Sequence, residues 1–253
     1  MSLEKESRKY RNLFSGDDLI YFTKKIEQTD LCIGALKNLN KEAEESIKKY
    51  RQLIKDYIRR QPVFLHSLVP VKPLFDAPLI VKHMCHAAEI AGVGPMAAVA
   101  GAVSMYVAHD LMPYSSELVI ENGGDIFLAG SSDRTVSVHA GKSLLSDKIG
   151  IKLKKDELPI SVCTSSGTVG HSLSFGKADA AVILSNDACL ADAAATAIGN
   201  IVKTAEDIKQ ALNKVKKISG VTGALVIVGS DMGAWVMWSC AGCDKRRCGC
   251  VSS

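Results

Sequence analysis

The sequence predicts an α+β fold, a single two-layer domain in which helices cover an antiparallel sheet. Short apolar segments bounded by turn residues occur near the start, in the middle and at the end of the chain, as is typical of strands. Longer segments between them place apolar residues at helical spacing. With 253 residues and 47% hydrophobic content, the chain can bury a substantial core. We expect one domain over residues 1–238 and a short Cys-rich tail over residues 239–253.

The chain is expected to begin with strands and a long helix. A turn-rich tetrapeptide, residues 15–18, separates the first two strands and predicts a hairpin, after which a third strand follows. These strands cover residues 10–14, 19–26 and 31–35. Residues 40–60 then carry apolar side chains at helical spacing. Asn40 is the expected N-cap of this helix, and Pro62 ends it.

A proline-containing connector, residues 64–75, leads to two further helices. Asp76 is expected to cap the first helix and Gly92 to end it. Gly94 and Pro95 are expected to start the second helix, with Pro95 at a first-turn position that proline tolerates. The two helices cover residues 77–91 and 96–109. Because the second is rich in Ala and Gly, we expect it to pack closely against a sheet or another helix.

The second half of the chain is expected to alternate strands with helices. Strands are predicted at residues 117–121, 125–129, 135–140, 159–163 and 178–184. Helices are predicted at residues 189–202 and 205–217. Residues 224–228 and 234–238 are expected to close the fold as a hairpin.

Charge and hydropathy argue against nucleic-acid and membrane partners. The net charge is only +4, and no compact basic cluster is interleaved with aromatic residues. The longest uncharged stretch, residues 90–108, is Ala/Gly-rich and contains Pro95, so it is interpreted as a buried helix rather than a membrane span. No secretory signal is visible in the polar, charged residues 1–11, which predicts a cytoplasmic protein.

Three segments carry candidate ligand-binding residues, and the first lies between two predicted strands. Asn122, Gly123, Gly124 and Asp125 form an Asn-Gly-type turn, and paired glycines also allow a ligand to approach the backbone closely. The two interpretations are compatible, so the segment is both a predicted turn and a candidate contact.

The second segment follows the strand predicted at residues 159–163. Its hydroxyls and backbone N–H groups could bind an anion such as phosphate, although it is not a Walker loop, and an ordinary polar loop has the same composition. His171, just beyond it, could bind phosphate or transfer protons, or be structural. The candidate ligand-binding residues are Thr164, Ser165, Ser166, Gly167 and Thr168.

The third segment is a helix made almost entirely of alanine. Asp192 and Thr196 lie four residues apart and therefore on one helical face. A carboxylate and a hydroxyl could bind a hard cation such as Mg²⁺, completed by backbone oxygens and a ligand phosphate. Asp125, Asp179 and Asp187 are candidate neighbours. An aspartate near a helix start is also favoured by the helix dipole without any metal.

The three segments together resemble the ApbE-like superfamily, the flavin transferases once called thiamine-biosynthesis lipoproteins. The segments that carry this resemblance are Asn-Gly-Gly-Asp-Ile (122–126), Cys-Thr-Ser-Ser-Gly (163–167) and Ala-Asp-Ala-Ala-Ala-Thr-Ala (191–197). The sequence is more similar to an uncharacterised cytoplasmic branch, which shares Gly-Pro-Met-Ala-Ala-Val-Ala-Gly (94–101) and Gly-His-Ser-Leu-Ser-Phe-Gly (170–176), over most of residues 8–238.

The resemblance implies a fold, a ligand and a metal. It implies the superfamily's two-layer α+β fold, a flavin contact at Gly123, Gly124 and Asp125, and Mg²⁺ held by Asp192 and Thr196 against the flavin diphosphate. The transferases also carry a His-Ile-Ile-Asp-Pro-type segment and a long insertion after their Ser-Gly loop. This chain has neither, which argues against FMN transfer to a protein.

In a reducing compartment the eight cysteines are expected to have roles other than disulfide bonds, and they fall into two groups. Cys32, Cys85, Cys163 and Cys189 lie in apolar segments, where free cysteine behaves as a small buried hydrophobe. The other four crowd into the tail and could bind Zn²⁺ or an iron–sulfur cluster, or be redox-active thiols of a disordered segment. These tail cysteines are Cys240, Cys243, Cys248 and Cys250.

Two functions remain open at this point, and neither decides whether the protein is an enzyme. In the first, the chain binds a flavin or another small phosphate-bearing ligand, with Mg²⁺. In the second, it handles sulfur in thiol amino-acid synthesis, a role that the resemblance to the uncharacterised branch makes plausible. Cys163 would then be a catalytic residue that carries a thiolate or persulfide, and His171 is the other catalytic candidate. The tail would relay sulfur or electrons, and a redox or sulfur-donor protein would be a partner. A homo-oligomer is compatible with either function.

Overall fold

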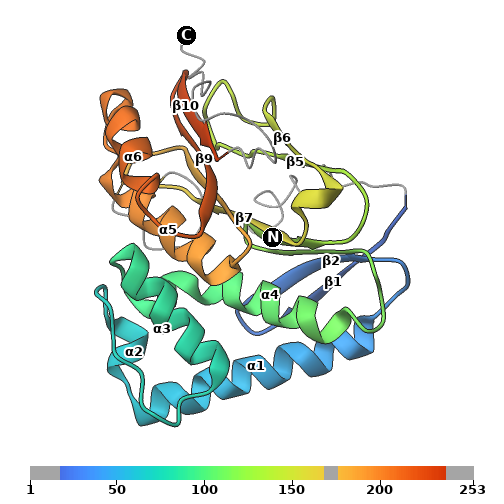
Figure 1. Ribbon diagram of the computed structural model, residues 1–253. Coiled ribbons are helices and arrows are strands. Elements are labelled where there is room, and N and C mark those ends of the chain that lie inside the picture. The colour runs from blue at the N-terminus through green and yellow to red at the C-terminus, as the bar shows by residue number, and fades with distance from the viewer. Residues whose placement is uncertain (1–17, 168–175, 238–253) are drawn as a thin grey trace, which may run out of the picture.

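The computed structural model describes residues 18–167 and 176–237. The strand predicted at residues 10–14 lies outside these ranges, as do Thr168, His171 and the Cys-rich tail. Figure 1 shows the arrangement of the elements, which confirms the α+β class and the antiparallel sheet covered by helices.

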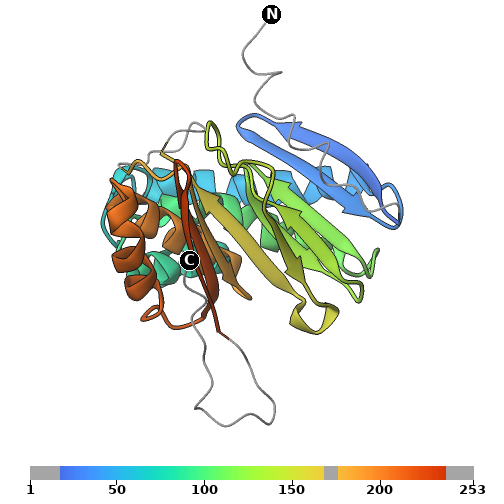
Figure 2. The same ribbon diagram turned by 90° about the horizontal axis from the view of Figure 1, so that it is seen from above.

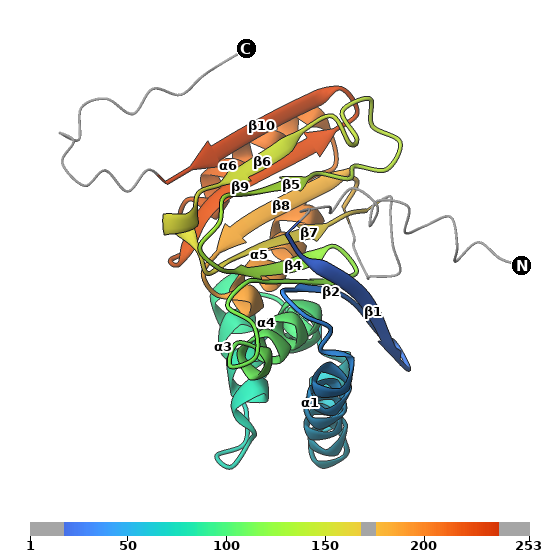
Figure 3. The same ribbon diagram turned by 90° about the vertical axis from the view of Figure 1, so that its right-hand side faces the viewer.

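One eight-stranded sheet runs through the molecule, with its strands in the order β1-β2-β3-β4-β7-β8-β9-β10 (Figure 3). Every neighbouring pair in it is antiparallel. The strands are β1 (Ile20–Ile26), β2 (Thr29–Ala35), β3 (Leu118–Asn122), β4 (Asp125–Ala129), β7 (Ile160–Ser165), β8 (Ala180–Ser185), β9 (Val221–Val228) and β10 (Asp231–Val236). A separate two-stranded sheet pairs β5 (Arg134–Ser137) with β6 (Gly150–Leu153).

The helices lie together on one face of the eight-stranded sheet, as Figure 2 shows from above. They are α1 (Asn40–Arg60), α2 (Val63–His66), α3 (Leu79–Ala91), α4 (Val99–Leu111), α5 (Ala188–Ile201) and α6 (Ile208–Val215). Because side chains alternate along a strand, each strand serves two cores. On β7, Cys163 belongs to the helix-side core, whereas Val162 packs with Val136 of β5 in a second core on the opposite face.

Helix α1 has the predicted bounds, and its buried face follows the predicted periodicity through Ala43, Ile47 and Ile54. The predicted caps of α1 and α3 are wrong. Leu39 holds the N-cap position of α1, and Asn40 is its first helical residue. Helix α3 begins after Pro78, and Asp76 pairs with the Arg60 guanidinium instead, at 2.7 Å.

Several boundaries differ from the predicted ones. The strand predicted at residues 159–163 continues to Ser165, so Thr164 and Ser165 belong to β7 rather than to a loop. The predicted connector begins within a short helix, α2, and β6 was not predicted. The helix predicted at 205–217 opens with a 3-10 turn, Ala205–Asp207, and its α-helical part ends at Val215.

Helices α3 and α4 meet at a break that contains Gly92 and Gly94. Gly92 ends α3 with a φ of 73°, as its predicted role as a helix stop requires. A Cβ atom at Gly94 would lie 1.8 Å from the Ser67 carbonyl oxygen, so no larger residue fits there. In the described residues no single helix is long and apolar enough to cross a membrane. The one helix pair that would suffice together, Leu79–Ala91 with Pro95–Leu111, is bent by 106°.

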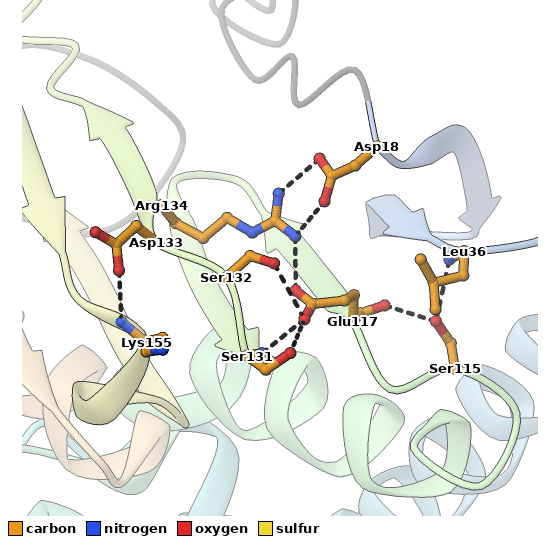
Figure 4. Close-up of polar contacts among 9 residues, drawn as sticks. All are labelled: Asp18, Leu36, Ser115, Glu117, Ser131, Ser132, Asp133, Arg134 and Lys155. Atoms are coloured by element: carbon orange, nitrogen blue, oxygen red, sulfur yellow. Dashed lines mark hydrogen bonds and ion pairs between the residues drawn. The ribbon is translucent and has the colours of Figure 1, made fainter.

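A buried ion pair joins the start of β3 to the start of β5 (Figure 4). The Arg134 guanidinium lies 2.6 Å from the Glu117 carboxylate, and the two side chains are only 12% and 8% exposed. Glu117 also accepts hydrogen bonds from the backbone N–H and the hydroxyl of Ser131. Burial acts to raise the pKa of Glu117, but Ser131 and Arg134 outweigh it and hold that pKa below its ordinary value. On its outer side Arg134 binds Asp18.

Arg134→Met should destabilise the protein by about 3–5 kcal/mol, because it leaves the buried Glu117 carboxylate without its cation. Asp18→Asn, which removes only the 47% exposed partner of the same arginine, should cost about 1 kcal/mol or less. Urea-induced unfolding measures both changes. Equal losses in the two variants would show that the buried pair has no special weight.

Candidate functional site

Helices α4 and α5 come into direct backbone contact at Gly101. A Cβ atom at this position would lie 2.2 Å from the Ala188 carbonyl oxygen and 2.9 Å from the Asp192 Cβ, so only glycine allows the contact. The closeness lets the Gly101 backbone N–H donate a 2.9 Å hydrogen bond to Asp192 Oδ2. The predicted close packing of the Ala/Gly-rich helix is confirmed, and its partner is α5.

Helix α5 presents one polar edge. Asp192, Thr196 and Asn200 follow one another at intervals of four residues and are partly exposed, whereas nearly all the other side chains of the helix are buried. The predicted shared face of Asp192 and Thr196 is therefore present. The buried positions are mostly alanine, so the helix packs closely against the sheet and α4 and leaves only this edge for polar contacts.

The predicted turn between residues 122 and 125 is confirmed as the hairpin connection of β3 and β4, in which Asn122 pairs with Asp125. Gly123 and Gly124 have φ values of 67° and 110°, which suit glycine. The turn is fixed to the helix layer because Asn122 Nδ2 donates to the Ala100 carbonyl oxygen at 3.1 Å. Glu121, to which the sequence assigned no ligand-binding role, closes the turn by accepting from the Gly124 N–H at 3.0 Å.

Asp125 connects this turn to β7. Its Oδ1 accepts a 3.2 Å hydrogen bond from the Thr164 backbone N–H, and its carbonyl oxygen lies 3.3 Å from the Ser104 hydroxyl of α4. The side chain is buried. Asp125, Thr164, Gly101 and Asp192 therefore belong to one connected region formed by β4, β7, α4 and α5.

The electrostatics of this region are those of two carboxylates with no counter-charge among the residues that the structure describes. Burial raises the pKa of Asp192 to about 7, although hydrogen bonds from the Gly101 and Ala100 backbone act in the opposite direction. Burial, and next the charge of Asp192, raise the pKa of Asp125 well above its ordinary value. Within the described part of the chain, neither carboxylate forms an ion pair. A bound cation would reduce the repulsion between the two carboxylates and supply the positive charge that they lack.

Cys163 lies beside these carboxylates on the helix side of β7. The side chain is fully buried, and its Sγ is 3.8 Å from the Ala188 carbonyl oxygen. Burial, followed by the nearby charges of Asp125 and Asp192, raises the pKa of the thiol well above its ordinary value. These surroundings favour a neutral thiol over a reactive thiolate. The catalytic and sulfur-handling roles suggested for Cys163 stay predictions.

The remaining predicted residues are divided between this region and other places. Ser165 is buried, whereas Ser166 and Gly167 are accessible just after β7. Asp179 and Asp187 are occupied elsewhere. Asp179 Oδ2 accepts from the Gly229 N–H at 2.7 Å, and Asp187 caps α5 through the Cys189 N–H.

Sequence reasoning assigned no site role to Glu121 and did not predict the contact that Gly101 makes with Asp192. Glu121 carried a signal, because it is a charged residue inside an apolar strand directly before the Asn-Gly turn. Gly101 lay in a segment correctly expected to pack closely, but nothing local showed that α5 would be the partner.

Comparison with known proteins gives both a fold and a family. The ApbE protein of Thermotoga maritima superposes with a TM-score of 0.58 and 13% identity, covering 85% of this chain and 96% of that one. A point mutant of the flavin transferase ApbE from Vibrio cholerae superposes with a TM-score of 0.56 and 10% identity, covering 87% and 98%. At such identities the likeness shows the fold alone, which is that of ApbE-like proteins.

The family follows from sequence. A family model described as AbpE bacteria matches residues 11–234. A UPF0280 protein of Methanococcus aeolicus is 45% identical over 196 residues, which are 76% of this chain and 79% of that protein. A UPF0280 protein of Methanocaldococcus jannaschii is 42% identical over 198 residues, 76% of this chain and 80% of that protein. The chain belongs to this UPF0280 family of ApbE-like proteins.

Asp192→Asn should change how thermal stability depends on pH. A carboxyl whose pKa is raised on folding contributes stability at low pH that is lost as the pH rises from its unfolded value, near 3.8, through about 7. The variant lacks this loss, so its melting temperature relative to wild type should increase between pH 5 and pH 8. Thermal unfolding at the two pH values measures this, with Glu206→Gln on the exposed surface as control. The same melting-temperature difference between variant and wild type at pH 5 and pH 8 would show that folding does not raise the pKa of Asp192.

Proposed function

We propose that this protein binds a phosphate-bearing small molecule, in the first instance a flavin nucleotide, together with Mg²⁺. The observation that carries the proposal is a pair of carboxylates, the buried Asp125 and the partly exposed Asp192, brought together from β4 and α5 without a counter-charge in the described residues. The proposal is supported by the fold, which the chain shares with proteins named flavin transferases.

The donors present fit a magnesium ion. Mg²⁺ prefers oxygen ligands and is usually held by one or two carboxylates and substrate phosphates. Asp125, Asp192 and the Thr196 hydroxyl would hold it, and Thr196 lies on the same partly exposed edge as Asp192. Bound there, Mg²⁺ supplies positive charge that offsets the phosphates of the ligand.

The protein backbone would provide the remaining contacts. Among the described residues no atom lies within 4 Å of a Cβ position built at Gly123, so within that part of the chain a flat ring can approach the turn without meeting a side chain. Ser166 and Gly167 are accessible directly after the end of β7, and within β7 the Thr164 backbone N–H donates to Asp125. The proposal is confined to binding, because Cys163 is buried as a neutral thiol.

Calorimetric titration with FMN and with FAD, each with and without Mg²⁺, tests the proposal. Wild-type protein should bind at least one of them more tightly when Mg²⁺ is present. Asp192→Asn should weaken the Mg²⁺-dependent binding about tenfold or more, equivalent to about 1.4 kcal/mol. Thr196→Val, which removes a hydroxyl at nearly constant shape, should weaken it in the same direction.

The matched control is Asp179→Asn, since Asp179 does not belong to the carboxylate region and instead accepts a hydrogen bond from the Gly229 N–H. This variant should bind as wild type does. Failure of the wild-type protein to take up either flavin under any Mg²⁺ condition, or equal affinities in the Asp192 and Asp179 variants, would refute the proposal.

A further inference from the structure

A second group of side chains that could bind a metal ion lies around the first turn of α5. His83 of α3, together with Asp187 and Cys189 at the start of α5, places one nitrogen, one oxygen and one sulfur atom within 4.8 Å of one another. None of these residues contributes to the carboxylate site built on Asp125 and Asp192. We propose that His83, Asp187 and Cys189 form a binding site for a thiophilic divalent cation of the Zn²⁺ class.

Two of the three donors are already oriented. Asp187 Oδ1 accepts hydrogen bonds from the backbone N–H groups of Cys189 and Leu190, at 2.9 and 3.2 Å. The Asp187 N–H donates to the Ser185 hydroxyl at 3.1 Å, which fixes the backbone just before the helix. The second carboxylate oxygen, Oδ2, is thereby directed toward His83 Nε2, 2.9 Å away.

The donor set selects the kind of cation. Imidazole nitrogen, thiolate sulfur and carboxylate oxygen are the ligands of Zn²⁺, with bonds of about 2.0–2.3 Å. Donor atoms around such an ion lie roughly 3–4 Å apart. The three donor atoms here lie within 4.8 Å of one another, so small side-chain rotations would bring them to that spacing. Mg²⁺ prefers all-oxygen surroundings, so this site differs in chemistry from the proposed Mg²⁺ site.

Access and the surrounding hydrogen bonds also suit a metal ion. The side chains of His83 and Asp187 are 33% and 32% exposed, so an ion can reach these two donors from solvent, and the buried Cys189 would supply the innermost one. Tyr106 Oη lies 3.5 Å from His83 Nδ1 and can accept a hydrogen bond from Nδ1–H, a tautomer that leaves the Nε2 lone pair free for the ion. Metal binding ionises the Cys189 thiol and releases its proton to water. Water completes the fourth position on the exposed side.

The test uses the full-length chain with the four tail cysteines changed to serine, because the tail is a separate candidate for metal binding. Zn²⁺ is titrated with a competing chelator, and Co²⁺ serves as a spectroscopic probe of thiolate ligation. One equivalent of Zn²⁺ should bind, and Co²⁺ should give a sulfur-to-metal charge-transfer band. His83→Gln and Cys189→Ala should each weaken Zn²⁺ binding by more than about 100-fold, beyond the range of changes that act only through a ligand's neighbour.

Matched controls come from the same helix as His83. His86→Gln alters an exposed histidine one turn away, and Cys85→Ala alters a buried cysteine outside the group, so both should bind as the parent does. Asp187→Asn keeps a good N-cap residue and removes the charge, which separates loss of a ligand from loss of the helix start. Tyr106→Phe should weaken binding about tenfold through the orientation of His83.

If Cys189→Ala fails to fold, the comparison of His83→Gln with His86→Gln still tests the site, because His83 is partly exposed and its replacement should be tolerated. Binding of one Zn²⁺ that is lost in His83→Gln and retained in His86→Gln supports the site. Absence of Zn²⁺ uptake by the parent, uptake that is equal in His83→Gln, or a Co²⁺ complex without the thiolate band would each overturn it.

Discussion

The direct contact between helices α4 and α5 at Gly101 determines the rest of the candidate site. Because Gly101 has no side chain, the Ala188 carbonyl and the Asp192 side chain approach the backbone of α4 closely. The same approach lets a backbone N–H reach the Asp192 carboxylate and places that carboxylate near Asp125. A single methyl group at position 101 would push the two helices apart, and the two carboxylates would separate with them.

The alanines of α5 complete this arrangement. Small side chains at the buried positions bring the helix close to the sheet, where Cys163 of β7 reaches the Ala188 carbonyl. They also leave the helix only one polar edge, which begins at Asp192. A helix of larger residues would fill the same space with apolar volume and would hold the carboxylate away from the hairpin turn.

Local features of the site could be predicted from the sequence, and long-range ones could not. The Asn-Gly turn and the helical face shared by Asp192 and Thr196 follow from turn chemistry and helical periodicity, and both are present. The contact between Gly101 and Asp192 joins residues 91 positions apart, and no local pattern specifies it. For the same reason three aspartates were equal candidates as neighbours of Asp192, and only packing separated Asp125 from Asp179 and Asp187.

Boundary errors have a similar physical origin. Asp76 has the chemistry of an N-cap, but Pro78 sets the helix start and Arg60 takes the carboxylate. Strand β6, with the sequence Gly-Ile-Lys-Leu, is short and only weakly patterned, and its pairing with β5 rather than its composition makes it a strand. The extension of β7 to Ser165 likewise depends on pairing with β8, which polar residues alone do not indicate.

The pairing of β4 with β7 joins the two halves of the chain. Only three Cα pairs connect these strands, fewer than any other neighbours in the eight-stranded sheet share. The bond from Thr164 to Asp125 lies just beyond the end of this short ladder and adds one more link across it. The candidate-site residues Asp125 and Thr164 therefore also link an early-synthesised part of the polypeptide to a later one. During synthesis this region cannot assemble until β7 and α5 have emerged, so a chain truncated before β7 would hold the whole 122–125 turn but neither Thr164 nor Asp192.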